Sequence, residues 1–167
     1  NVIDRQTGGG GTELLPALNR VLKLPRLENY SRSIIVVTDG YVMVEEEVFD
    51  LIRTNLNDAN MFAFGIGSSV NRHIIEGMAH VGMGEPFVIT KPADAPAQAE
   101  RFRALIESPV LTKVKVSFNG FSAYDVEPPS VPDVLADRPV VVFGKWKGSP
   151  KGTITVTGTS GSGKFTQ

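Results

Sequence analysis

Two polar residues of this 167-residue chain stand where they could bind a ligand, one after a short apolar run and one after an earlier glycine loop. The run 34–37 holds four β-forming residues, and Thr38 and Asp39 come directly after it. A carboxylate and a hydroxyl are hard oxygen donors, which suit Mg²⁺ because that ion binds one or two protein oxygens and keeps several waters. An earlier glycine loop, 8–11, leads into Thr12 at the head of a helical pattern. Asp39 and Thr12 are therefore candidate metal ligands.

Both residues also have an ordinary structural explanation. An aspartate after a strand often bonds to the backbone of its own turn. A threonine before a helix often caps the first free amide groups of that helix. The residues alone leave both explanations open for Asp39 and Thr12.

The first two thirds of the chain predict alternating helices and strands. Apolar residues at helical spacing follow Thr12, and later segments alternate between short apolar runs and amphipathic stretches. Helices are expected over 12–24, 45–57, 71–81 and 94–107, and strands over 33–38, 61–67 and 86–89. This alternation indicates βαβ units around a parallel sheet covered on both faces. Ligands of such sheets bind at the carboxyl ends of the strands, where Asp39 would lie.

The remaining chain changes to a period of two residues. Polar and apolar residues alternate over 113–118, 123–126, 139–146 and 152–157, with turn signals between them. We therefore predict an α/β fold, a partial doubly wound, Rossmann-like parallel sheet followed by a small antiparallel β domain. The expected divisions are 1–108 for the α/β part, 109–157 for part of a β-sandwich, and 158–167 for a Gly/Ser linker.

Composition excludes several classes of protein. The formal net charge is −1, which lacks the basic footprint of a nucleic-acid-binding protein. The chain has no cysteine, so disulfides and thiolate metal sites are excluded. No apolar run approaches the ~20 residues that a membrane-spanning helix needs. The nine phenylalanines are expected in the core.

Three motifs suggest other chemistry and are incomplete. Residues 158–164 fit G-x-x-x-x-G-K, but Phe165 stands where a phosphate-binding loop needs Ser or Thr. The turn 65–67 has two glycines and lacks the third of a dinucleotide loop. His73 and His80 share a helix face without the glutamate of a zinc-protease motif. We predict no catalytic residue, and a nucleotide-dependent enzyme is the least favoured alternative.

Longer stretches resemble a known family. The strand end VVTDG, the preceding GGGGTELLPAL and the following FAFGIGSSVNRHIIEGMAHVGMGEPFVI resemble von Willebrand factor type A domains over about residues 7–107. The tail LTKVKVSFNGFSAYDVEPPSVPDVLADRPVVVFGKWKG, followed by GTITVTG, is similar to the inter-α-trypsin inhibitor heavy-chain-like branch. In that branch a β-sandwich adjoins the A domain.

The resemblance implies a non-enzymatic, metal-ion-dependent adhesion site. Thr12 matches the loop threonine of that site, and Asp39 matches its later aspartate. The family's D-x-S-x-S motif occurs nowhere in the chain, and three strands that the family places before Thr12 are missing. We therefore interpret residues 1–108 as the C-terminal part of such a domain. Mg²⁺ or Mn²⁺ is expected only when an upstream D-x-S-x-S motif is present.

The partner implied by the resemblance is a protein whose exposed Asp or Glu completes the shell of the cation. The alternative is a metal-free scaffold or interaction domain with a degenerate site. The missing strands would leave one edge of strand 33–38 unpaired, so the chain on its own is expected to self-associate through that edge or to be unstable. The resemblance favours an extracellular or bacterial-envelope setting, and the sequence does not determine the localisation.

Overall fold

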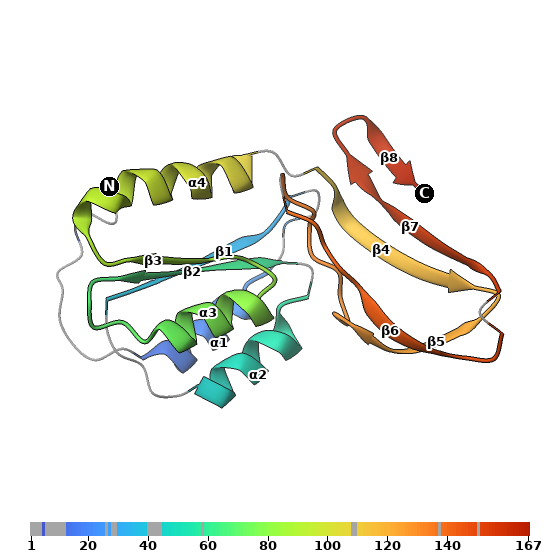
Figure 1. The fold of residues 1–167 in the computed structure, drawn as a ribbon, viewed down its shortest axis with the longest axis horizontal. Coiled ribbons are helices and arrows are strands. Elements are labelled where there is room, and N and C mark those ends of the chain that lie inside the picture. The colour runs from blue at the N-terminus through green and yellow to red at the C-terminus, as the bar shows by residue number, and fades with distance from the viewer. Residues whose placement is uncertain are drawn as a thin grey trace.

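The computed structural model describes residues 5, 13–25, 27, 30–39, 45–57, 59–107, 110–136, 138–149 and 151–167. The order along the chain is α1 (Leu14–Leu22), β1 (Ser33–Thr38), α2 (Glu45–Asn55), β2 (Asn60–Ile66), α3 (Arg72–Val81), β3 (Pro86–Ile89), a short 3-10 helix (Pro92–Asp94), α4 (Ala95–Glu107), β4 (Thr112–Asn119), β5 (Ser122–Glu127), β6 (Phe143–Lys147), β7 (Thr153–Ser160) and β8 (Gly163–Thr166). Figure 1 shows an α/β part beside an elongated β part.

The α/β part is built on a parallel sheet with the order β1-β2-β3. Helices α1, α2 and α3 cover one face of this sheet, and α4 covers the other (Figure 1). Asn71 precedes α3, and its side-chain oxygen accepts a hydrogen bond from the backbone N–H of Ile74 at 3.3 Å. The predicted fold class is confirmed.

The strand β2 is the centre of the core because it is buried on both faces. Met61 and Ala63 pack with the apolar residues of α1, α2 and α3. Phe62 and Phe64 face α4, where both rings meet Phe102 edge-on at centroid distances of 5.1 and 5.2 Å. Full burial of one such ring stabilises a fold by about 2–3 kcal/mol, so this sheet anchors the molecule.

One face of β1 lacks the cover that the sequence predicts. Ile34 is buried under α1 and α2, whereas Ile35 and Val37 keep 49% and 59% of their surface exposed. The prediction of burial on both faces is wrong here, because α4 packs on β2 and β3 through Phe102 and Leu105. Among the described strands, β1 pairs with β2 alone, so its outer edge is open.

The β part consists of two antiparallel sheets, β4-β7-β8 and β5-β6. The antiparallel prediction is confirmed, although the strand predicted over 139–146 begins only at Phe143. The predicted linker over 158–167 is wrong, because β8 forms a hairpin with β7. Gly163 has φ +111°, a conformation that favours glycine, where β8 begins after the turn. The division at residues 108 and 109 stays a prediction.

The β part joins the sheet at the amino ends of its strands. Backbone hydrogen bonds link Leu111 and Val134 in an isolated antiparallel bridge. Leu135 is buried in the aromatic core beneath α4. Figure 1 places the β part at the end of the sheet opposite the β3–α4 connection, and hence opposite the carboxyl ends of the strands. The two parts therefore share a packed junction.

Candidate functional site

Asp39 lies at the carboxyl edge of the sheet, as its place after β1 predicts. Thr38 is the last residue of β1, is buried, and stands in register with Gly65 of β2. Asp39 follows it as an exposed residue outside the strand. The carboxylate is therefore accessible to a ligand. Thr12, the second predicted metal ligand, lies outside the described residues.

The turn from β2 to α3 lies at the same edge. Gly67 has φ +101°, and its N–H donates to the carbonyl oxygen of Ile89 at 2.8 Å. This conformation favours glycine and lets the chain leave the sheet sharply, so Gly67 serves the turn, whereas Gly65 lies in β2 and packs against Ile75 and Val70. Ser68 and Ser69 follow as exposed residues, and their hydroxyls lie near the carboxyl ends of the strands.

The donors at this edge have the chemistry that a hard cation needs. Mg²⁺ is commonly held by one or two carboxylates while it keeps several waters, and Asp39 supplies one such carboxylate. Within the described ranges, no three His, Cys, Asp or Glu side chains converge as a ready-made metal cluster. The binding of a cation by Asp39 therefore stays a prediction.

The two histidines of α3 do not form a metal site with other described residues. His73 and His80 are both exposed, and the ring of His73 meets the ring of Phe49 edge-on at 5.9 Å. His80 lies near the opposite end of the helix, where it lines a cleft. The G-x-x-x-x-G-K segment forms the β7–β8 hairpin, so it lacks the helix that a phosphate-binding loop requires.

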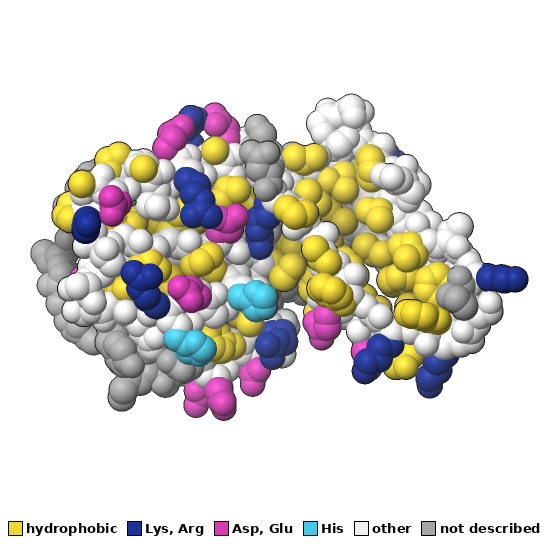
Figure 2. Space-filling view, viewed as in Figure 1, with side chains coloured by type: hydrophobic (Ala, Val, Ile, Leu, Met, Phe, Trp, Pro, Cys, Tyr) yellow, Lys and Arg dark blue, Asp and Glu magenta, His cyan; other side chains and the backbone are white. Residues whose placement is uncertain are grey.

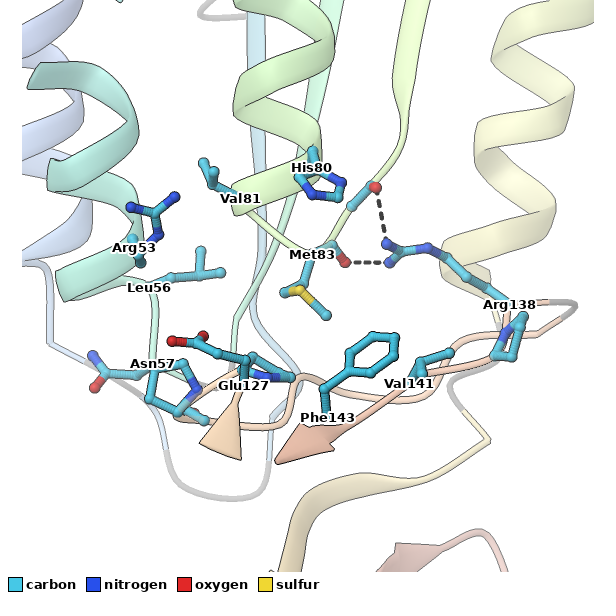
Figure 3. A pocket seen from close by; sticks show the side chains of 15 residues that line it. Arg53, Leu56, Asn57, His80, Val81, Met83, Glu127, Arg138, Val141 and Phe143 are labelled. Carbon is cyan, nitrogen blue, oxygen red and sulfur yellow. Dashed lines mark hydrogen bonds between the residues drawn. The ribbon is translucent and has the colours of Figure 1, made fainter. Parts of the chain in front are cut away.

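A cleft of about 580 Å³ lies where the α/β part meets the β part. The ends of α2 and α3 form one wall, and the end of β5, the start of β6 and the chain between them form the other (Figure 3). Its lining residues run from Arg53 to Phe143, so no local spacing in the sequence could have revealed it. Phe143 is 70% exposed, which corrects the prediction that every phenylalanine lies in the core.

Arg138 fixes one side of this cleft. Its guanidinium donates to the backbone carbonyl oxygens of Met83 and Gly84, the latter at 2.9 Å (Figure 3). Burial lowers the pKa of Arg138, and the charge of Glu85 partly offsets this effect. The arginine ties the chain before β6 to the turn between α3 and β3.

Asp133 ties the same junction from a buried position. Its carboxylate accepts hydrogen bonds from the hydroxyl of Ser31 and, at 3.3 Å, from the backbone N–H of Lys113. Asn60, which is fully buried, donates to the carbonyl oxygen of Met83 at 2.9 Å. Sequence analysis missed this network because its members come from separate elements up to 102 residues apart.

Among the described residues, no helix is both long and apolar enough to cross a membrane.

Comparison with known proteins identifies similar domains. A family model of the von Willebrand factor type A domain matches residues 1–86. A von Willebrand factor A domain-containing protein of Dictyostelium discoideum is 26% identical over 117 residues, which cover 70% of this chain and 13% of that protein. A second such protein of the same organism is 24% identical over 150 residues, covering 89% of this chain and 18% of its own length.

One solved structure has a similar fold. The ArnB paralog VWA2 from Sulfolobus acidocaldarius superimposes with a TM-score of 0.62 at 20% identity, covering 97% of this chain and 47% of that chain. The similarity includes the β part as well as the α/β part, since it covers nearly the whole chain. The chain spans less than a fifth of the length of the two Dictyostelium relatives.

Proposed function

Because the chain belongs to the von Willebrand factor type A domain family, we propose that it is a non-enzymatic protein-binding module that depends on a divalent cation. Domains of this family generally serve in protein interactions. The family therefore supports an interaction role, and the cation dependence is the further step of the proposal.

The observation that carries the proposal is the place of Asp39. Its carboxylate is exposed at the carboxyl edge of a parallel sheet, directly after the buried Thr38. That edge is where open α/β sheets bind their ligands. Asp39 and Thr12 would hold Mg²⁺ or Mn²⁺ together with an upstream D-x-S-x-S motif. When bound, the cation would offer an open position to an Asp or Glu carboxylate of the partner protein.

Replacing Asp39 with alanine is expected to abolish binding of Mg²⁺ and Mn²⁺, because it removes a charged ligand that water cannot replace. Isothermal titration calorimetry measures this in the chain extended by any residues that its gene encodes before Asn1. Asp125→Ala is the matched control, since Asp125 is also exposed but lies in the β part. Equal cation binding by the Asp39→Ala variant and the unaltered protein would overturn the assignment.

The second candidate function is a metal-free scaffold or interaction domain. It is favoured by the absence of a D-x-S-x-S motif from residues 1–167. The same calorimetry separates the two proposals. If the extended chain binds neither cation, the interaction role stands, and the surface that contacts the partner lies away from Asp39.

The open edge of β1 supports the expectation of self-association. A groove of about 310 Å³ lies along α1 and β1, and Val37, which is among its lining residues, is 59% exposed. Val37→Lys is expected to weaken association of the chain about tenfold, because a charge on an edge strand opposes pairing. Sedimentation velocity over a wide range of protein concentration measures this, with Ile154→Lys on exposed β7 as the control. A chain that stays monomeric throughout would contradict the expectation.

A further inference from the structure

The cleft between the α/β part and the β part is a second candidate binding site. It has a volume of about 580 Å³, which lies within the range of ligand-binding pockets, and it lies at a junction between packed units. It is at the amino ends of the parallel strands, whereas Asp39 is at their carboxyl ends (Figure 1). A ligand of the cleft is therefore independent of the cation proposed above.

Large apolar side chains line the cleft without being covered. Phe143 is 70% exposed and Val141 is 54% exposed. In Figure 3 the side chain of Met83, from the turn after α3, and the ring of Phe143, from the start of β6, both project into the cleft. Figure 2 shows apolar surface on the β-part side of the hollow between the two parts, and histidine and basic side chains on the other side. Exposed apolar surface in a concave place is typical of a binding site.

The wall formed by the helix ends carries an arginine and a histidine. Arg53 lies in the last turn of α2, and His80 lies in the last turn of α3. Helix dipoles favour basic residues at such ends, which accounts for their presence there. Arg53 makes one exposed ion pair with Asp50 at 3.3 Å, which is weak and leaves other guanidinium donors accessible. Glu127, at the end of β5, faces Arg53 and His80 from the opposite wall (Figure 3).

We infer that this cleft binds an acidic peptide segment of a partner protein, with an apolar side chain between Phe143 and Met83 and a carboxylate beside Arg53 and His80. An arginine fork pairs well with a carboxylate. Glu127, at the end of β5, repels acidic groups from its side of the cleft. The charges of the cleft therefore also set the direction in which the peptide segment binds. The hydrogen bonds of Arg138 hold the two walls together before the ligand arrives, which lowers the cost of ordering the site.

The probe is the acetylated and amidated hexapeptide Gly-Glu-Phe-Asp-Glu-Gly, titrated into the ¹⁵N-labelled chain and followed by amide chemical shifts. EDTA is present, so that cation-dependent binding at Asp39 cannot contribute. The expected result is a saturable shift of the amides that line the cleft. Arg53→Glu and Phe143→Ser are each expected to weaken binding about tenfold. Both residues are exposed, so thermal melting should show that both variants remain folded.

Three controls make the test decisive. Arg72→Glu changes the charge of an exposed residue at the other end of α3 and should leave binding unchanged. The hexapeptide with lysine at its acidic positions should not bind, and neither should one with serine in place of phenylalanine. Equal binding of the lysine peptide, shifts away from the cleft, or no shift at millimolar peptide would overturn the proposal. If the amide chemical shifts of the cleft residues change with protein concentration in the absence of peptide, the cleft binds a second copy of this chain. That result would also overturn the proposal.

Discussion

Replacing Gly84 with alanine is expected to destabilise the fold by about 4 kcal/mol, at the extreme of single substitutions. A Cβ at Gly84 would overlap the backbone carbonyl of Met61. Neither backbone segment can easily move aside. The N–H of Met61 donates to the carbonyl oxygen of Gly82 at 2.7 Å, and the N–H of Gly84 donates to the carbonyl oxygen of Ala79 at 2.9 Å. The free energy of unfolding in urea measures the loss.

Gly161→Ala is the matched control for this substitution. Gly161 lies in the turn between β7 and β8, where an added Cβ would meet no atom within 4 Å. Its alanine variant should unfold at the same urea concentration as the unaltered chain. A Gly84→Ala variant of unchanged stability would mean that the packing of the α3–β3 turn against β2 is wrong.

Replacing Asp133 with alanine is expected to cost about 3 kcal/mol of folding stability. Asp133 is 3% exposed, and its carboxylate accepts from the Ser31 hydroxyl and the Lys113 amide. Removing the buried carboxylate breaks both hydrogen bonds, and a hydrogen bond to a charged group contributes about 1.5–3 kcal/mol. Urea denaturation again gives the magnitude.

Asp50→Ala is the control for Asp133, since its ion pair with Arg53 is exposed and should contribute less than about 1 kcal/mol. Amide hydrogen exchange adds a second readout. In the Asp133→Ala variant, protection should fall at Lys113 and in the rest of β4 more than in β2. A loss spread evenly over the chain, or a loss no greater than that of the control, would contradict the proposed role of the junction.

The helices and strands were predictable where a regular hydrophobic spacing is bounded by turn-forming residues. The bounds of β1 and β3 match the predicted 33–38 and 86–89, since each is a short apolar run between turn residues. The hairpin strand β8 was missed because Gly, Ser and Thr around residue 160 hide the alternation of a strand. The exposed face of β1 was missed because a two-sided apolar pattern does not reveal whether a helix reaches the edge of the sheet.

The candidate site was predictable only in part, for the same reason. The place of Asp39 follows from local sequence, because any residue after a parallel strand lies at the carboxyl edge. Its role in binding a cation stays a prediction, and so does the role of Thr12. The junction around Asp133 and Arg138 depends on contacts across more than 50 residues, which no pattern of period two or 3.6 encodes.

The position of the β part at the amino ends of the strands has a mechanical consequence. Ser31, just before β1, is fastened to Asp133 at one end of the strand, and Asp39 lies at the other end. A partner pulling on Asp39 against an anchored β part would load β1 along its length. The hydrogen bonds between β1 and β2, which span six residue pairs, would then carry the force in shear and share it. Such a domain resists tension along the sheet better than it resists peeling of β1 from its open edge.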